Sequence, residues 1–162
     1  MKFQTADLCD SYQNRLQVAD PILYSYGGNN ACYGQITTIK LDEDNSALVA
    51  LLKSDGKGRI AVVDAQAKYC AIVGDTLMGF ASKNNWRGII VNGYVRDTQN
   101  TKDIAVGLWA IGTCPRKSAK KAPAHTCIEL NFANIIFKEG AYLYADADGI
   151  VVSQEELLRT SK

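Results

Sequence analysis

The stretch from Ile72 to Thr98 constrains this 162-residue chain most, because it joins two polar pairs through one predicted helix and one predicted strand. Residues 75–85 predict a helix, since the apolar side chains in and just after it fall mostly on one face. These side chains are Leu77, Phe80, Ala81 and Trp86. Residues 89–94 predict a buried strand rich in β-branched side chains. The helix carries the chain roughly 16 Å one way at ~1.5 Å per residue, and the strand returns it about 20 Å at ~3.3 Å per residue. The pair Arg96-Asp97 should therefore lie level with Gly74-Asp75, at the strand end where open α/β folds bind ligands.

The two pairs offer groups that suit an anion and a metal ion. Gly74 permits close approach of the backbone to a ligand, and the first amides of the helix have no partner within it. Those amides, at the positive end of the helix dipole, suit a carboxylate or a phosphate. Arg96 can hold a planar carboxylate through two parallel hydrogen bonds, and Asp97 offers a hard oxygen ligand to Mg²⁺ or Mn²⁺. The corner could thus seat a metal and an anionic keto acid. A capped helix at Asp75 and a surface turn at Arg96-Asp97 would explain the same residues equally well.

Composition predicts a single domain over residues 1–162 that folds around a sizeable core, with 47% hydrophobic and 22% charged residues. The formal net charge of +1 gives no bulk attraction to nucleic acid or to an acidic membrane. The first residues form no apolar run fit for a signal peptide, and no segment is long enough to span a membrane. Five widely spaced cysteines form no CxxC pair and indicate reduced thiols rather than a zinc site or disulfide framework. We expect a cytoplasmic protein.

The order of the remaining elements predicts an α/β fold. A parallel sheet should carry helices on one side and an antiparallel sheet on the other. The predicted elements are a helix over 5–13 with Thr5 as N-cap, a Gly- and Asn-rich loop over 24–34, a strand over 35–41, a helix over 44–52, a strand over 59–65, a helical turn over 101–103 and a strand over 105–114.

The C-terminal third predicts consecutive strands with tight turns, followed by a short helix that starts at Ser153. Asp146 and Asp148 fit a hairpin turn better than a set of ligands. The basic loop with Arg116, Lys117, Lys120 and Lys121 fits a solvated loop better than an anion-binding patch. His125 is the single histidine, so it cannot build a triad or a multi-histidine metal site, and we expect it in a loop.

Asp75, twenty intervening residues and then Arg96-Asp97 resemble the D-x20-R-D motif of the RraA-like class II aldolases. These are the 4-hydroxy-4-methyl-2-oxoglutarate aldolases, which share a fold with the regulator of ribonuclease E activity A. The resemblance spans nearly the whole chain, through TADLCDSY, YGGNNACYGQITTIK, GKGRIAVVDA, NNWRGIIVNGYVRD, PRKSAKK and LYADADGIVVS. It implies the three-layer β/β/α swivelling-domain-like fold, with a parallel central sheet plus an antiparallel sheet. It also implies a ring-shaped homotrimer with active sites at the subunit boundaries.

The same resemblance implies a metal-dependent aldolase that cleaves 4-hydroxy-4-methyl-2-oxoglutarate into two pyruvates. Oxaloacetate decarboxylation should be a second activity, because it passes through the same enolate. In the implied mechanism the amides of Gly74, Asp75, Thr76 and Leu77 hold the carboxylate of the pyruvyl group. Arg96 contacts that group and Asp97 anchors Mg²⁺ or Mn²⁺, so Arg96 and Asp97 are the implied catalytic residues. No Schiff-base lysine is needed, and the general base is a water or a residue of the adjacent subunit.

A second hypothesis is a trimeric regulator that binds ribonuclease E or an RNA helicase, because such proteins resemble this chain near Leu8–Tyr12 and Tyr142–Gly149. Asp97 favours the enzyme, since the regulator lacks an acidic residue after its arginine. A methyltransferase label given to relatives is discounted, because the chain has no Gly-rich turn that would hold S-adenosylmethionine. The chain departs from the family at Ala65-Gln66-Ala67, at residues 122–125 and at Ala133-Asn134. These departures leave open which keto acid fits.

Overall fold

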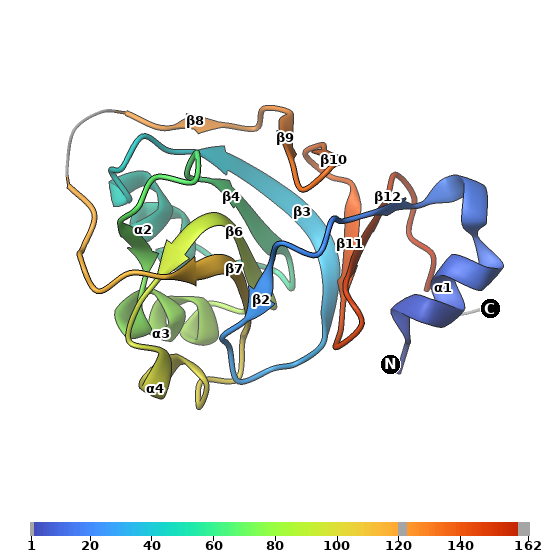
Figure 1. The fold of residues 1–162 in the computed structure, drawn as a ribbon, viewed down its shortest axis with the longest axis horizontal. Helices are drawn as coiled ribbons and strands as arrows, with labels where there is room; N and C mark the ends of the chain where they lie inside the picture. Colours follow the sequence, from blue (N-terminus) through green and yellow to red (C-terminus); the bar gives the residue numbers. More distant parts are fainter. Residues whose placement is uncertain (1, 120–122, 159–162) are drawn as a thin grey trace.

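The computed structural model describes residues 2–119 and 123–158. Ten strands form one curled sheet in the order β1-β12-β11-β3-β4-β6-β7-β2, with β5 beside β6 and β8 beside β3; β9 and β10 form a separate hairpin (Figure 1). The elements are α1 (Thr5–Ser11), η1 (Gln13–Arg15), β1 (Gln17–Val18), β2 (Tyr24–Ser25), β3 (Cys32–Lys40), α2 (Ser46–Lys53), β4 (Ile60–Asp64), β5 (Ala71–Val73), α3 (Asp75–Lys83), β6 (Gly88–Val95), α4 (Thr98–Thr101), β7 (Gly107–Thr113), β8 (His125–Thr126), β9 (Leu130–Phe132), β10 (Ile135–Phe137), β11 (Tyr142–Ala145) and β12 (Ile150–Ser153).

The centre of the sheet is parallel, and helices α2 and α3 cover one of its faces (Figure 1). Alternate residues of β4 serve the two faces: Ala61 and Val63 join the core beneath the helices, whereas Ile60 and Val62 join the core on the other side. Trp86 ties the helices together, because its indole N–H donates to the Ser54 carbonyl at 3.0 Å. The predicted helix after Gly74 and the predicted strand that follows it are both confirmed.

Strand β3 joins the parallel and antiparallel parts of the sheet. Its second half pairs in parallel with β4, and its first half pairs antiparallel with β11. The antiparallel strands therefore continue the main sheet, which curls until they face its helix-free side and enclose a second core with the β9–β10 hairpin. The three-layer β/β/α arrangement that the resemblance implied is confirmed.

Helix α1 lies against the outer face of β11 and β12 and is capped from a distance. Thr5 was predicted to be the N-cap, but it is the first helical residue and Gln4 is the N-cap. The carboxylate of Asp146 accepts from both the Thr5 amide and its hydroxyl, each at 2.7 Å. Asp146 also accepts from the Asp148 amide at 2.9 Å, as the predicted turn requires. The helix ends at Ser11, earlier than predicted, and a 3-10 turn follows it.

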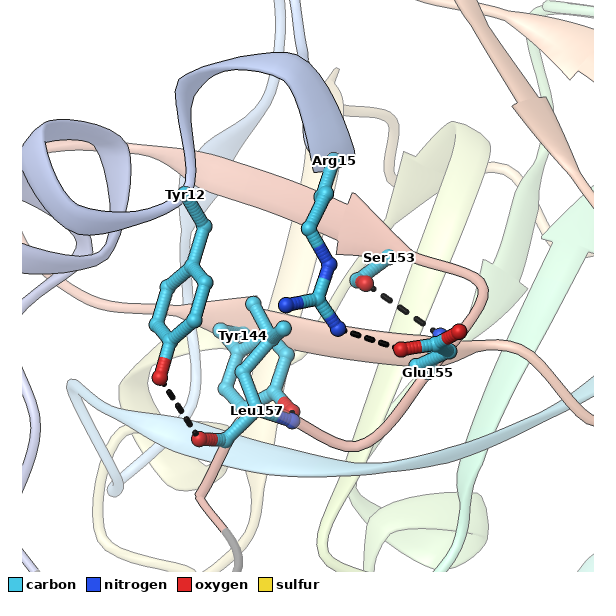
Figure 2. A network of polar contacts seen from close by, with 6 residues as sticks. All are labelled: Tyr12, Arg15, Tyr144, Ser153, Glu155 and Leu157. Atoms are coloured by element: carbon cyan, nitrogen blue, oxygen red, sulfur yellow. Dashed lines mark hydrogen bonds and ion pairs between the residues drawn. The ribbon is translucent and has the colours of Figure 1, made fainter.

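The predicted helix from Ser153 is wrong: Ser153 ends β12, and residues 154–158 form no helix. Figure 2 shows the reason. The Leu157 amide donates to the Tyr144 hydroxyl at 2.7 Å, the Tyr12 hydroxyl donates to the Leu157 carbonyl at 3.4 Å, and Arg15 pairs with Glu155. These contacts come from Tyr12 just after α1, from η1 and from β11, so residues far away in the sequence hold the segment in a non-helical conformation.

Other predicted boundaries also need correction. The predicted loop over 24–34 is shorter, because Tyr24 belongs to β2 and Gly34 to β3. The helical turn predicted over 101–103 lies too late in the chain: α4 spans Thr98–Thr101 and shares only Thr101 with the prediction. His125 lies in β8, where it pairs with Lys40 of β3, rather than in a loop. Lys120 and Lys121 lie outside the described residues. Within the described ranges, no helix is long and apolar enough to cross a membrane.

At two of the three places where the chain departs from the family, a turn holds non-glycine residues in the left-handed region. Gln66 and Ala67 have φ of 56° and 53°, and Ala133 and Asn134 have φ of 52° and 58°. The Gln66 side chain gains a partner there, because its amide donates to the Leu41 carbonyl at 2.8 Å. Ala67 is exposed and its side chain has no polar group, so only its backbone amide, which donates to the Asn92 carbonyl at 3.1 Å, offsets the strain at this position.

Replacing Ala67 with glycine should stabilise the fold by about 1 kcal/mol, because it relieves a left-handed alanine without removing a buried methyl group. Thermal or urea unfolding measures the change. Gln66→Gly is the matched control at nearly the same φ. Its gain should be smaller, since the bond to Leu41 is lost, and an equal gain in both variants would contradict this account.

Candidate active site

Strand β5 and the end of β6 bring the two polar pairs together. The strands run in parallel, with Ala71 opposite Tyr94 and Val73 opposite Val95. The Arg96 amide then donates to the Val73 carbonyl at 3.0 Å. Gly74, which follows β5 as the N-cap of α3, therefore lies beside Arg96-Asp97, which follows β6. The predicted level placement of the pairs is confirmed, although β5 itself was not predicted.

Asp97 reaches back over Gly74. It has a left-handed backbone (φ 57°) and is the N-cap of α4. Its Oδ2 lies 3.5 Å from the Asp75 amide nitrogen and 3.8 Å from Arg96 Nε. A Cβ at Gly74 would lie 2.5 Å from the same oxygen, so no larger residue fits there unless the carboxylate moves. Glycine is therefore needed at position 74 to leave space and not for its backbone conformation, because any residue can adopt this extended backbone (φ −134°).

A small cavity of about 70 Å³ opens at this corner. Its lining comes from four separate segments of the chain: Asn45, Ala71, Ile72, Gly74, Thr76, Leu77, Arg96, Asp97, Lys117 and Ser118. Of the predicted site residues, it includes Gly74, Thr76, Leu77, Arg96 and Asp97. The first amides of α3 have no acceptor within the helix, and they point toward an anion at this end. The Asp75 amide nitrogen already lies 3.5 Å from Asp97 Oδ2.

The side chain of Asp75 points elsewhere. Its Oδ2 accepts a hydrogen bond from Asn100 Nδ2 of α4 at 2.8 Å, and Asp75 is absent from the cavity lining. The bond from Asn100 is the main reason that the pKa of Asp75 falls below its usual value. Asp75 Oδ1 lies 3.5 Å from the hydroxyl of Thr76, which does line the cavity, so the carboxylate stays at the edge of the site.

Asn45, Lys117 and Ser118 were not predicted as site residues. Asn45 precedes α2, and its side-chain Nδ2 donates to the Ile72 carbonyl at 2.8 Å, which fixes the Asn45 side chain at the cavity wall. Lys117 was assigned to a solvated loop, but it bridges to Ala71 as a further parallel partner of β5. The Ala71 amide donates to the Arg116 carbonyl at 2.7 Å, and the Ser118 amide donates to the Ala71 carbonyl at 3.1 Å. The basic residues of the PRKS segment were the sequence feature that could have indicated Lys117 and Ser118. The segment reaches the cavity only by pairing with Ala71, however, which lies far away in the sequence.

The charges of the lining suit an anion beside a metal ion. Arg96 and Lys117 are its cations and Asp97 is its carboxylate. The described part of the chain contains no group of three or more His, Cys, Asp or Glu side chains placed to hold a metal. A half-exposed single carboxylate nevertheless fits Mg²⁺ or Mn²⁺, which can keep several waters and use one or two protein carboxylates.

A larger hollow of about 430 Å³ lies elsewhere, beside Val18–Ser25 and the turn at 146–149. Its lining includes Asp20, Asp146 and Asp148 but no basic side chain among the described residues. A hollow of about 450 Å³ beside residues 10–15 is larger still, and it too lies away from the two polar pairs. We place the candidate active site at the smaller cavity, because there the first amides of α3, two cations and a carboxylate converge.

Comparison with known proteins identifies the family of this chain. The family model described as "RraA-like: Aldolase/RraA" matches residues 5–152. The chain belongs to the RraA-like family. A protein of Aromatoleum aromaticum, provisionally named 4-hydroxy-4-methyl-2-oxoglutarate aldolase, is 43% identical over 98% of this chain and 100% of its own length. A Dechloromonas aromatica protein with the same provisional name is 40% identical over 97% of this chain and 99% of its own length.

Solved structures give RraA-like relatives with other names. A Geobacillus kaustophilus structure described as an S-adenosylmethionine: 2-dimethylmenaquinone methyltransferase has a TM-score of 0.94 and 37% identity over 99% of this chain and all of that one. The structure of the RNA-processing inhibitor RraA from Thermus thermophilis has a TM-score of 0.92 and 29% identity over the full length of both chains. The RraA-like fold is thus shared by proteins with three different functional names.

Replacing Gly74 with alanine should displace the Asp97 carboxylate and leave the fold intact, because the new Cβ would meet Asp97 Oδ2 at 2.5 Å. A crystal structure of the variant measures the shift. Gly79→Ala in the same helix is the control, since its Cβ would meet no atom within 4 Å. That control should stabilise α3 by up to about 1 kcal/mol and leave Asp97 in place. An unmoved Asp97 in Gly74→Ala would contradict the close-approach argument.

Proposed function

We propose that this RraA-like protein is a metal-dependent aldolase that cleaves 4-hydroxy-4-methyl-2-oxoglutarate to two pyruvates. The observation that carries the proposal is the convergence of Asp97, Arg96 and the first amides of α3 on one small cavity. Relatives at 43% and 40% identity that carry the provisional aldolase name support it.

The residues of the cavity divide the work of binding. The amides of Gly74, Asp75, Thr76 and Leu77 are proposed to receive the carboxylate of the pyruvyl group at the positive end of α3. Arg96 provides a planar two-pronged contact to the same group. Lys117, across the cavity, adds a second positive charge that suits the other carboxylate of this dianionic substrate.

Asp97 is the proposed ligand of Mg²⁺ or Mn²⁺. When bound, the metal would supply Lewis-acid polarisation of the keto oxygen. The bond between C3 and C4 breaks, its electron pair enters the enolate of the first pyruvate, and the C4 hydroxyl loses its proton as the second pyruvate forms. A proton then returns to C3. Arg96 and the α3 amides hold the carboxylate next to the carbonyl while this charge develops. Oxaloacetate loses CO₂ to give the same enolate, so we propose decarboxylation as a secondary activity.

We also propose that the enzyme acts in the cytoplasm as a homotrimer. The side chains of Arg96 and Asp97 are 41% and 38% exposed, so the corner is open to a neighbouring subunit. The general base is then a water or a residue that such a neighbour contributes, since the described cavity lining offers no histidine and no carboxylate other than Asp97.

An alternative is a non-catalytic regulator that binds and inhibits ribonuclease E or contacts an RNA helicase. The likeness to the RNA-processing inhibitor from Thermus thermophilis favours it. Asp97 favours the enzyme, because the resemblance implies that the regulator lacks an acidic residue after its arginine. The methyltransferase name of the Geobacillus structure finds less support, because the turn Val73-Gly74-Asp75 has one glycine rather than the Gly-rich turn that would hold S-adenosylmethionine.

Pyruvate release from 4-hydroxy-4-methyl-2-oxoglutarate and from oxaloacetate, followed with added Mg²⁺ or with EDTA, tests the proposal. We expect activity that needs the metal. Asp97→Ala should lower kcat/KM by about 100- to 1,000-fold, because it removes the anchor of the charge-stabilising group. Asp103→Ala changes another exposed carboxylate nearby and should leave the rate unchanged.

Two results would count against the enzyme. Equal rates for wild type and Asp97→Ala would remove Asp97 from the mechanism. A folded wild-type protein that turns over neither keto acid with Mg²⁺ or Mn²⁺, yet lowers ribonuclease E cleavage, would establish the regulator instead.

A further inference from the structure

The hollow of about 430 Å³ beside residues 18–25 lies where the two ends of the curled sheet approach each other, and the proposed function gives it no role. Strands β1 and β2 lie at opposite ends of the sheet, yet only residues 19–23 connect them (Figure 1). Six residue steps span at most about 22 Å, so the two sheet ends lie within that distance. The connection, Trp109 of β7 and the turn between β11 and β12 enclose the hollow.

The Trp109 side chain offers an unpaired donor to this hollow. Trp109 is 3% exposed, and no described residue accepts a hydrogen bond from its indole N–H. Among the described residues, no fully enclosed side-chain nitrogen or oxygen lacks a partner, so the Trp109 nitrogen is accessible from outside. The benzo ring points back to Gly107, where a Cβ would lie 2.5 Å from Trp109 Cζ3. The opposite, N–H edge of the indole is therefore the edge that faces the hollow.

Three carboxylates surround the hollow, and two of them are open to a ligand. Asp146 is committed, because it accepts from Thr5 and from the Asp148 amide. Asp20 and Asp148 are exposed, and no described residue donates a hydrogen bond to either carboxylate. The Asp20 backbone is fixed, since its amide donates to the Ala133 carbonyl at 2.9 Å. With no basic side chain among the described lining residues, the rim attracts cations.

Apolar side chains form the walls between the rim and the indole. Val18 and Tyr24 both line the hollow and are 57% and 59% exposed, so a ligand would remove apolar surface from water. The Tyr24 ring also offers a face to a cation. The volume falls within the range of about 300–1,000 Å³ that small-molecule sites occupy. Further apolar lining comes from Pro21, Leu23 and Ile150.

We propose that this hollow is a second binding site, independent of the candidate active site, and that its ligand is a small amphipathic amine. The ammonium group pairs with the carboxylates of Asp20 and Asp148. The apolar body of the ligand packs against Val18 and Tyr24, and a hydroxyl or carbonyl oxygen accepts from the Trp109 N–H. The negative rim repels carboxylic acids, so the hollow is not a second keto-acid site.

Tyramine is the probe, because it carries an ammonium group, an aromatic body and a hydroxyl oxygen. Indole N–H signals in NMR follow its binding, since the chain has two tryptophans. Tyramine should shift the Trp109 signal and leave that of Trp86, whose N–H is bonded to the Ser54 carbonyl. Phenethylamine lacks the hydroxyl and should bind about fivefold more weakly, the usual net effect of one hydrogen bond. Hydroxyphenylpropionate, with a carboxylate in place of the ammonium, should not bind measurably.

Substitutions in the hollow test each contact. Asp20→Asn and Asp148→Asn should each weaken tyramine binding by about fivefold, the effect of one unit charge about 4 Å away in water-like screening. Asp103→Asn changes an exposed carboxylate outside the lining and should match wild type. Trp109→Phe keeps a ring but removes the N–H, so tyramine and phenethylamine should then bind equally.

Several results would overturn the proposal. These are an unmoved Trp109 signal, equal binding of the carboxylate analogue, and equal losses in Asp20→Asn, Asp148→Asn and Asp103→Asn, which would indicate a general charge effect. A hollow covered by a second copy of the chain would also leave the Trp109 signal unmoved. If Trp109→Phe does not fold, the wild-type comparison decides: equal affinities of tyramine and phenethylamine reject the indole contact. None of these outcomes depends on aldolase activity.

Discussion

The close approach of Asp97 to the backbone of Gly74 is the contact on which the candidate site depends. It requires β5 and β6 to run in parallel and end together, so that the Arg96 amide reaches the Val73 carbonyl. It also requires a missing side chain at position 74 and a left-handed backbone at Asp97. The first of these two conditions restricts position 74 to glycine, and the second places a non-glycine residue in a strained backbone conformation. Together they place a carboxylate, a guanidinium and a helix N-terminus around one small cavity.

Strand pairing and packing on both faces of the sheet support the site. Strand β3 pairs in parallel with β4 along half its length and antiparallel with β11 along the other half, so one strand belongs to both layers. The central strands are buried on both faces, beneath α2 and α3 on one side and against β9–β12 on the other. The partly exposed Arg96 and the exposed Lys117 therefore project from the edge of a sheet that is packed on both faces.

Local pattern predicted the parts of this protein that local pattern controls. Helix α3 and strand β6 follow from periodicity, and their lengths alone indicated that Gly74 and Arg96 would meet. Contacts between distant segments set the remaining features. Asn45 and Lys117 reach the cavity through bonds to Ile72 and Ala71, and a remote carboxylate, Asp146, caps α1. The tail after Ser153 takes its shape from the Tyr12 and Tyr144 hydroxyls, which no reading of the tail alone reveals. The left-handed backbone of Ala67 was likewise not predictable from its residue type, because glycine is the residue that usually marks such a conformation.

The central claim is that the corner binds a keto-acid carboxylate and a divalent metal as neighbours in one site. Calorimetric titration of pyruvate with and without Mg²⁺, and of Mg²⁺ with and without pyruvate, tests it most directly. Ligands that meet in one site must change each other's affinity by the same factor. The account predicts mutual tightening of about tenfold or more, which corresponds to about 1.4 kcal/mol of coupling. Equal pyruvate affinity in the presence and absence of the metal would contradict it.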